Sequence, residues 1–511
     1  MSAKNRSAKP KPLLNFAQTE SGNAEMFAAV VGNDVRYDDK QGHWLIWNGQ
    51  RWRVDGSGRA MRRYMKLAIR RRLKQAFKLP SDDPRRLKEI KWCSRSESRY
   101  SIDAALELAK SEPPIVDDGE GWDNDPWRFG VANGIFDLRT GQLRAATRQD
   151  RITKFSPVKF DPQAPCPRWM QFLDEIFLGN APVIRFVQKA AGYSMTGSVV
   201  EHVIIVLYGT GRNGKTTLLE IFLQVLGDYG TDVRFAILEA NRRAAPGEGV
   251  NLMGARFAKS VETKRGRHLD EGRIKAWTGG DTLSVRPLYR NDIHFSPTHK
   301  LWLAVNDKPE IDDSSPAMWE RIRLVPFERR FVGHDRDKDL LEKLKGEASG
   351  ILNWMIQGCL AWQQEGLEAP ETVEHATREY AEDSDPLSAF VKERCEVGAG
   401  FEVGRGELYD AYRKWCEEGG QEPLKIGDFK SRMAQKFSPG RSGHDRKRVW
   451  KGLRLQELTG DADSGQTRTE ISINSPIGSN PEELIEKLCP QVSACPQRLS
   501  LAELALPMED E

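Results

Sequence analysis

The hydrophobic pattern changes character along the chain. In residues 44–54, aromatic and β-branched residues flank an Asn48-Gly49 pair, which predicts a β-hairpin because both central turn positions need a positive φ. Residues 59–79 repeat apolar side chains at helical spacing among lysines and arginines, which predicts an amphipathic helix with a very basic outer face. A second hairpin is predicted around Gly141. The amino-terminal part is therefore expected to be a mixed α+β module.

The middle of the chain alternates short apolar runs with helical patterns. Residues 203–208 are a short apolar run suited to a buried parallel strand, and residues 257–261 and 301–305 have the same character. Helical patterns dominate residues 337–382. This alternation predicts an α/β domain with a parallel sheet.

Three helical patterns and a basic hairpin end the globular part. The helices are expected near residues 386–396, 407–418 and 425–437, and the hairpin over residues 442–455. Three helices followed by a basic hairpin predict a winged helix.

Composition and charge narrow the class of protein. The 511 residues are 39% hydrophobic and 30% charged, and no apolar run is long enough to cross a bilayer, so we expect a soluble cytoplasmic protein without a membrane partner. Seven scattered cysteines without a CxxC pair argue against a disulfide scaffold and against a zinc site. Residues 59–99 hold 15 basic and 4 acidic residues, whereas residues 456–511 hold 3 basic and 11 acidic ones. The basic stretch suggests a surface that meets polyanions.

The strongest motif is a glycine-rich loop. Residues 209–216, Gly-Thr-Gly-Arg-Asn-Gly-Lys-Thr, match the phosphate-binding (P-loop) pattern between an apolar strand and a helix. Backbone N–H groups of such a loop surround phosphate oxygens, Lys215 reaches the β- and γ-phosphates, and the Thr216 hydroxyl coordinates Mg²⁺. We therefore predict ATP and Mg²⁺ as cofactors. The predicted nucleotide-binding residues are Gly209, Thr210, Gly211, Arg212, Asn213, Gly214, Lys215, Thr216 and Thr217.

Two polar residues follow the other apolar runs. Glu262 could order Mg²⁺ or the attacking water, or it could be a solvated acid at a strand end. Asn306 could contact the γ-phosphate or the water, or it could simply form a turn. Together with Lys215, both are predicted catalytic residues.

These motifs resemble a family. The P-loop, the Glu262 strand, and residues 274–281, 300–310 and 319–327 together resemble the superfamily 3 DNA helicases. Within them, the chain is similar to the C-terminal helicase part of phage and plasmid primases, relatives of the poxvirus-type helicase-primases. The resemblance runs from about residue 25 to about 455. It implies an AAA+-like superfamily 3 core in a P-loop NTPase fold.

The resemblance also implies an assembly and further site residues. It implies a homo-oligomeric ring, usually a hexamer, with each ATP between two subunits. Arg321 matches the arginine finger that reaches the neighbour's phosphate, with Arg323 as an alternative. The stretch after Asp281 matches a DNA-contacting hairpin that lines the ring's pore. Its predicted DNA contacts are Arg286, Tyr289 and Arg290.

Two further groups of residues are weaker candidates for DNA contacts. Basic residues on the third winged-helix helix and on its hairpin either bind duplex or forked DNA or form a solvated face. They are Lys425, Lys430, Arg432 and Lys436 on the helix, and Arg446, Lys447 and Arg448 on the hairpin. Trp44, Trp47 and Trp52 either stack on bases or form the core of their hairpin.

The predicted division has six parts. It comprises a disordered basic tail (1–22), an α+β module (23–156), a helical connector (157–200), the P-loop ATPase domain (201–382), the winged helix (383–455) and an acidic, mostly disordered tail (456–511).

The predicted function is an ATP-dependent replicative DNA helicase. It would serve a phage, plasmid or other mobile element in the cytoplasm of a bacterial host and act on single-stranded and forked DNA. A separate primase or polymerase is a further expected partner. Two alternatives stay open at this point, an ATP-regulated origin-binding initiator without processive unwinding and a small-molecule kinase.

Overall fold

The computed structural model describes residues 12–240, 242, 247–262, 264, 266–286, 292–311, 315–420, 422–443 and 446–456. Tyr289, Arg290 and the predicted acidic tail beyond Gln456 lie outside the described residues. Within the described ranges, no helix is long and apolar enough to cross a membrane.

The amino-terminal region combines a small sheet with four helices. The predicted hairpin is confirmed, since β2 pairs antiparallel with β3. Buried Trp44 packs into the core beside α1, with its ring 6.4 Å from that of Phe27, whereas the buried Trp52 ring lies 5.7 Å from that of Trp47, so the tryptophans pack in two separate groups. The sheet order is β3-β2-β1-β4. The elements are α1 (Glu20–Val31), β1 (Val35–Asp38), β2 (His43–Trp47), β3 (Trp52–Asp55), α2 (Arg59–Phe77), α3 (Pro84–Ser96), α4 (Arg99–Ala109) and β4 (Val116–Asp117).

The structure differs from the prediction of disorder for residues 12–22, the part of the predicted tail 1–22 that it describes. A 3₁₀ turn covers Leu13–Asn15, and Thr19 caps α1, which begins at Glu20. The reason is a buried arginine: Arg72 donates to the carbonyl oxygen of Phe16 at 2.8 Å and forms an ion pair with Glu89 at 2.8 Å. A buried charge needs such partners, so it holds the preceding segment against α2.

A second small sheet lies next along the chain. The predicted hairpin around Gly141 is confirmed by the pairing of β6 with β7. Tyr229 connects this sheet to the central domain, because its hydroxyl accepts a hydrogen bond from the Gly130 backbone N–H at 2.9 Å. The elements are β5 (Arg128–Val131), β6 (Gly134–Asp137) and β7 (Gln142–Arg144), followed by α5 (Pro167–Ile176) and α6 (Ala181–Tyr193).

The central domain is an α/β layer around a parallel sheet, as the alternating pattern predicts. The strand order is β14-β8-β13-β10-β9, and every neighbouring pair runs parallel. The strands are β8 (Ile204–Tyr208), β9 (Gly230–Asp232), β10 (Phe257–Glu262), β13 (Lys300–Val305) and β14 (Ile322–Pro326). Alternate residues of these strands enter two different hydrophobic clusters, one on each face, as expected for a doubly covered sheet.

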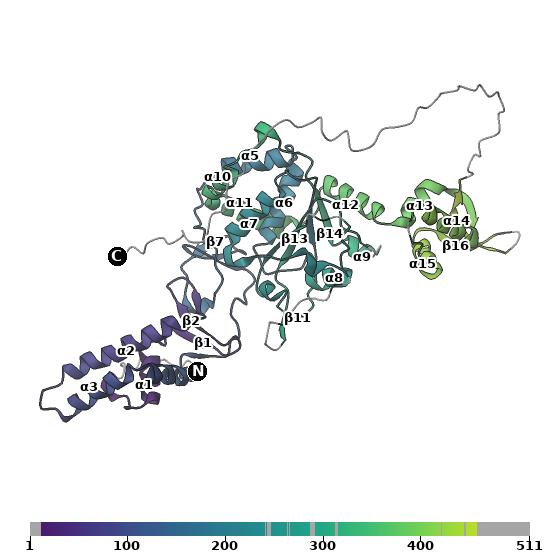
Figure 1. Ribbon diagram of the computed structural model, residues 1–511. Helices are drawn as coiled ribbons and strands as arrows, with labels where there is room; N and C mark the ends of the chain where they lie inside the picture. The colour runs from purple at the N-terminus through teal and green to yellow at the C-terminus, as the bar shows by residue number, and fades with distance from the viewer. Residues whose placement is uncertain are drawn as a thin grey trace, which may run out of the picture. The chain divides into compact units, whose positions relative to one another are not determined.

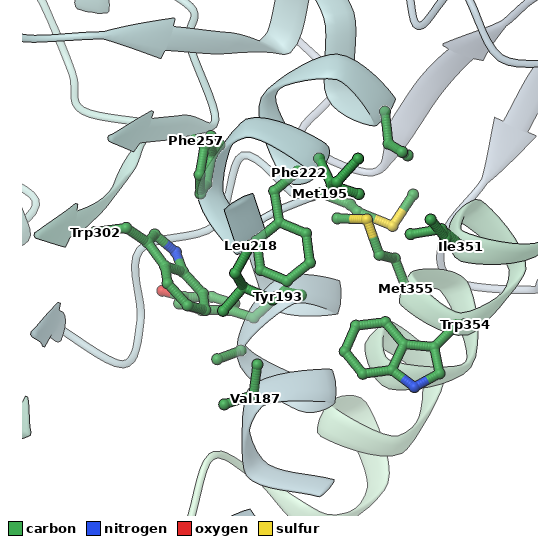
Figure 2. Packing of buried hydrophobic residues seen from close by; sticks show 14 of the residues in the cluster. Val187, Tyr193, Met195, Leu218, Phe222, Phe257, Trp302, Ile351, Trp354 and Met355 are labelled. Carbon is green, nitrogen blue, oxygen red and sulfur yellow. The ribbon is translucent and has the colours of Figure 1, made fainter. Parts of the chain in front are cut away.

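One face of the sheet holds the largest core. Figure 2 shows Phe222 of α7 (Lys215–Leu226) between the sheet and α11 (Ala348–Glu365). Its ring lies 5.5 Å from that of Trp302 on β13 and 6.3 Å from that of Trp354 on α11. The remaining elements of the domain are α8 (Glu271–Thr278), β11 (Leu283–Val285), β12 (Ile293–Phe295), α9 (Pro316–Trp319), α10 (Leu340–Gly346) and α12 (Glu371–Asp383).

The last described region has three helices and a three-stranded sheet. The helices α13 (Pro386–Arg394), α14 (Arg405–Glu418) and α15 (Ile426–Lys436) follow the predicted pattern, and β16 (Ser438–Arg441) pairs with β17 (Arg448–Leu455) as a hairpin. Strand β15 (Cys395–Gly404), which pairs with β17 across a register shift, is not predicted from the sequence. Its residues are mostly exposed and its partner lies far along the chain, so no local pattern marks it.

Candidate functional site

The glycine-rich loop joins the carboxyl end of β8 to α7. Gly214 has a φ of 90°, and a Cβ there would lie 2.6 Å from Ile176 of α5. A Cβ at Gly209 would lie 2.4 Å from the Phe327 carbonyl oxygen. Both positions therefore require glycine, because the loop runs tightly between α5 and the end of β14.

Lys215 is the cation at the centre of this loop. Its ammonium donates to the Gly209 carbonyl oxygen, to Asn213 Oδ1 at 3.1 Å and to Asn306 Oδ1 at 3.3 Å. Burial lowers the pKa of Lys215 to about 8, since a desolvated ammonium is less favourable than a neutral amine. Three oxygen atoms thus surround a positive group that is only 4% exposed.

A pocket of about 660 Å³ opens beside the loop, and we call it the loop pocket. Seven of the nine predicted nucleotide-binding residues line it, together with Asn306; they are Gly211, Arg212, Asn213, Gly214, Lys215, Thr216 and Thr217. Gly209 and Thr210 line a second pocket of about 560 Å³ instead. The loop therefore borders two hollows, and Lys215 and both threonines that follow it belong to the larger one.

The far wall of the loop pocket comes from residues that the sequence analysis did not single out. Arg168 of α5 and the segment Asp335–Lys338 line it, and Phe331 ties that segment to the loop by a hydrogen bond to the Arg212 carbonyl oxygen at 2.8 Å. Arg168 Nη2 lies 3.2 Å from Glu175. No motif marks these residues, because only the tertiary fold brings them to the loop.

The register of the sheet determines which of the predicted catalytic residues lie close to one another. Tyr208 lies level with Val305, so Asn306 follows at the same edge as Gly209 and reaches Lys215. Glu262 of β10 also lies level with Val305, because β10 is the neighbour of β13 on the side away from β8. Its carboxylate accepts from the Lys264 backbone N–H at 2.7 Å and lies 3.7 Å from Arg267, and it is Val261 that lines the loop pocket.

Magnesium ions in nucleotide sites take one or two protein ligands, with phosphates and water supplying the rest. Thr216 is exposed in the loop pocket at the first turn of α7, and the Glu262 carboxylate lies at the same sheet edge. Within the described ranges, no cluster of three or more His, Cys, Asp or Glu residues could hold a metal. The residues present fit an ion shared with a nucleotide, and that role of Thr216 and Glu262 stays a prediction.

Arg321 lies at the other end of the same sheet, where the parallel strands begin. It directly precedes β14, and its carbonyl oxygen accepts a hydrogen bond from the Ile204 backbone N–H, at the start of β8. At a strand rise of about 3.3 Å per residue, it lies about 16 Å along the sheet from the level of Tyr208. Its Nη1 is 3.3 Å from the His202 carbonyl oxygen, and its Nε is buried without a partner among the described residues. Arg321 therefore cannot reach the loop pocket of its own chain.

Arg323, the alternative finger, lies two residues further along β14. Its Nη1 donates to the carbonyl oxygens of Glu320 and Ile322, and burial lowers its pKa. Arg323 also lines a pocket of about 910 Å³, and its role as the alternative finger stays a prediction.

The predicted DNA-contacting residues fall into two groups. The antiparallel pairing of β11 with β12 forms the predicted hairpin, and the exposed Arg286 at its described end lies 3.9 Å from Asp292. Tyr289 and Arg290, the other two contacts predicted for this stretch, lie outside the described residues. In the last region, Lys430 of α15 and the hairpin residues Arg446, Lys447 and Arg448 are exposed.

Two of the basic residues assigned to α15 have another role. Lys436 lies 2.9 Å from the buried Asp385, and Arg432 lies 3.9 Å from it. Asp385 also caps α13 by accepting from the Leu387 backbone N–H. Arg432 and Lys436 therefore compensate a buried carboxylate, and their predicted contact with DNA stays a prediction.

Comparisons with protein families match three segments of the chain. The D5 N terminal like family matches residues 24–178, a family of unknown function (DUF5906) matches residues 207–322, and the Poxvirus D5 protein-like family matches residues 382–457. The three segments follow one another in the order of the regions described above.

Curated relatives come from large DNA viruses. "Putative helicase L207/L206" of Acanthamoeba polyphaga mimivirus is 24% identical over 57% of this chain and 33% of its own length. "Putative helicase 022R" of Frog virus 3 is 24% identical over 58% and 39%, and "Putative primase C962R" of African swine fever virus is 22% identical over 74% and 43%. The chain thus spans well under half the length of these relatives.

Among solved structures, the apo structure of the NrS-1 C terminal region matches at 10% identity and a TM-score of 0.48, covering 84% of this chain and 99% of that one. The family and sequence matches bear out the resemblance stated from the motifs. This chain is similar to the poxvirus-type helicase-primases, with a D5 N-terminal-like segment before its α/β domain and a poxvirus D5-like segment after it.

Proposed function

We propose that this chain is the subunit of an ATP- and Mg²⁺-dependent superfamily 3 DNA helicase. The observation that carries the proposal is the position of Lys215, whose ammonium is held by Gly209, Asn213 and Asn306 at the mouth of a 660 Å³ pocket. The sequence Gly-x-x-x-x-Gly-Lys-Thr between a buried parallel strand and a helix supports a P-loop. The names of the viral relatives support helicase or primase work on DNA.

The loop residues bind and orient the phosphates. The oxygen atoms that now surround Lys215 are exchanged for phosphate oxygens, which restore a full negative partner to its charge. The N–H groups at the first turn of α7 add the partial positive charge of a helix N-terminus. Thr216 and Glu262 would hold Mg²⁺, which neutralises charge on the β- and γ-phosphates when bound. Asn306, already hydrogen-bonded to Lys215, is suited to orient the attacking water.

The position of Arg321 supports hydrolysis at subunit interfaces. Because it lies at the sheet edge opposite its own loop pocket, any contact with a nucleotide is to one bound by a neighbouring subunit. A guanidinium supplied in this way contributes about 10³ to 10⁵ in rate. A homo-oligomeric ring, a hexamer as in the family, satisfies that geometry for every subunit.

The DNA contacts are assigned to two elements. Single-stranded DNA would pass the hairpin of β11 and β12, with Arg286, Tyr289 and Arg290 as its contacts. Residues 386–455 would act as a winged helix on duplex or forked DNA, with Lys430 and the exposed Arg446, Lys447 and Arg448 on phosphates. A separate primase or polymerase would supply the synthesis step.

A second candidate is an ATP-regulated initiator that binds an origin without processive unwinding. The exposed basic hairpin of the last region favours it, since that hairpin suits a duplex. The predicted bacterial host remains a prediction, because the relatives named above belong to large DNA viruses.

Strand displacement separates the two candidates. The purified protein is given a labelled forked DNA with ATP, with a non-hydrolysable ATP analogue, or without nucleotide. A helicase releases the labelled strand only with ATP, whereas an initiator retains the fork in all three conditions while its affinity for the DNA changes with nucleotide. Retention of the strand by assembled rings with ATP would reject the helicase proposal.

A further inference from the structure

Helix α2 (Arg59–Phe77) carries eight basic residues and no acidic one. It is the long purple helix of Figure 1. One side is buried through apolar residues such as Met61, Met65 and Ile69. On the other side, cations recur at intervals of three or four residues, so they form one stripe along the helix. The stripe consists of Arg59, Arg63, Lys66, Arg70 and Lys74, all exposed.

Most of this charge has no internal partner. Arg70 pairs with Glu97 at 2.9 Å, and Arg62, at the side of the stripe, pairs with Asp103 at 2.7 Å. Among the described residues, no ion pair with an acid is formed by Arg59, Arg63, Lys66, Arg71 or Lys74. Ion pairs thus neutralise the minority of the basic residues of α2, and the helix presents a surplus of positive charge to solvent.

An array of this kind repels itself. Like charges three or four residues apart on a helix destabilise it slightly, so the stripe opposes the helix that carries it. Packing of the apolar face outweighs that cost in the free chain. A polyanion along the stripe would remove the repulsion and release counterions from its own phosphates.

An exposed aromatic residue lies beside the stripe. Tyr100 in the first turn of α4 is 81% exposed. The same turn is held to α2 through Asp103, which pairs with Arg62 at 2.7 Å and with Arg99 at 3.6 Å. Phe77, at the end of α2, is 53% exposed. Cations that follow a backbone, with aromatic rings free to stack on bases, are the pattern of single-strand binding surfaces.

We propose that the α2 stripe and Tyr100 form a binding surface for single-stranded DNA, separate from the hairpin of β11 and β12 and from the last region. The cations contact successive phosphates, and the Tyr100 ring stacks on a base. A duplex offers the phosphates but not the base faces, because its bases are stacked on each other. Helix α2 is distant from Lys215 in the sequence, and binding of DNA to the stripe requires no nucleotide.

The test is binding of the full-length chain to a fluorescent oligothymidylate, followed by anisotropy without nucleotide as the salt concentration is raised. The stripe variant is Arg59→Gln, Arg63→Gln and Lys74→Gln, which leaves every ion pair of α2 in place. The control removes the same charge from exposed cations elsewhere that form no ion pair among the described residues, through Lys159→Gln, Arg234→Gln and Arg330→Gln. We expect the stripe variant to bind about tenfold more weakly, with a salt slope lower by about 2, and the control to change less than about twofold.

Stacking is tested at Tyr100. The Tyr100→Ala variant should bind the oligothymidylate about fivefold more weakly or worse, while Tyr100→Phe, which keeps the ring, should bind as the parent does. A blunt duplex should not distinguish these two variants. Because no step uses nucleotide, failure of the helicase proposal leaves this test intact.

Three results would overturn the proposal. The first is a stripe variant that binds the oligothymidylate like the control variant. The second is an equal loss of duplex binding with no effect of Tyr100→Ala, which would make the stripe a duplex surface. The third is loss of binding to anionic lipid vesicles with single-strand binding unchanged, which would make it a membrane surface.

Discussion

Two buried lysines lie at opposite ends of the strands of the central sheet. Lys215 lies beyond the carboxyl end of β8, and Lys300 lies at the amino end of β13. Each ammonium donates to three oxygen atoms; for Lys300 these are the carbonyl oxygens of Thr196, Ser198 and Thr298. Burial lowers the pKa of both, and for Lys300 the nearby Arg256 lowers it further.

The two lysines differ in the space beside them and in the kind of group that accepts their hydrogen bonds. Lys215 borders an open pocket, and two of its three acceptors are side-chain amides, which can turn toward another partner. Lys300 lies under the Tyr193 ring, 4.7 Å from its centre, and all its acceptors are backbone carbonyls. Burial and a lowered pKa are therefore shared by Lys215, which we propose binds a ligand, and by Lys300, and only the pocket and the kind of acceptor separate them.

The largest expected effect is on hydrolysis. Lys215→Met should lower the ATPase rate at least about 10³-fold, because the phosphates lose their main cation. The matched variant Lys300→Met should hydrolyse ATP normally wherever it is folded. Rates are measured by phosphate release at saturating ATP. If both variants lost ATPase activity equally, the proposed difference between the roles of Lys215 and Lys300 would be wrong.

The second effect is on stability, in the opposite order. Lys300→Met removes the donor shared by three carbonyls, of which that of Thr196 is buried, and this should lower the free energy of unfolding by about 3 kcal/mol. Lys215→Met should change it by less than about 1 kcal/mol, since the pocket can admit water. Urea unfolding followed by tryptophan fluorescence measures both. A Lys300→Met protein as stable as the parent would show that this cation is not structural.

The smallest effect is a pH dependence. The folded-state pKa of Lys300 lies well below 10.5, so between that pKa and 10.5 the unfolded chain binds more protons than the folded one. The free energy of unfolding contributed by Lys300 must therefore rise with pH, by at most about 1.4 kcal/mol per unit. The stability difference between the parent and Lys300→Met should grow as the pH of the measurement is raised toward 10.5. A constant difference would mean that Lys300 is charged in both states across this range.

The sequence predicts what depends on neighbouring residues in the chain. The hairpin around Gly49, the basic helix α2 and the buried strand β8 all follow local patterns, and the structure contains them. The loop pocket is only half predictable: Lys215 and Asn306 follow strand ends, whereas Arg168 reaches the pocket through tertiary packing.

Other differences have the same origin. Arg432 and Lys436 are indistinguishable from Lys430 in sequence, and only the burial of Asp385 shows that they compensate an acid. The order of residues 12–22 depends on the buried Arg72, which no local pattern reveals. Strand β15 depends on a partner some fifty residues away. Long-range contacts thus decide most of what the sequence cannot show.

The central claim is that the two edges of the sheet act on one nucleotide from different subunits, Lys215 from one and Arg321 from the next. Subunits carrying Lys215→Ala are mixed with subunits carrying Arg321→Ala, each inactive alone, and ATPase activity is measured once mixed rings are verified by native mass spectrometry. The account predicts recovered activity, because a mixed interface combines an intact Lys215 with an intact Arg321. Mixed rings without any recovered activity would contradict it.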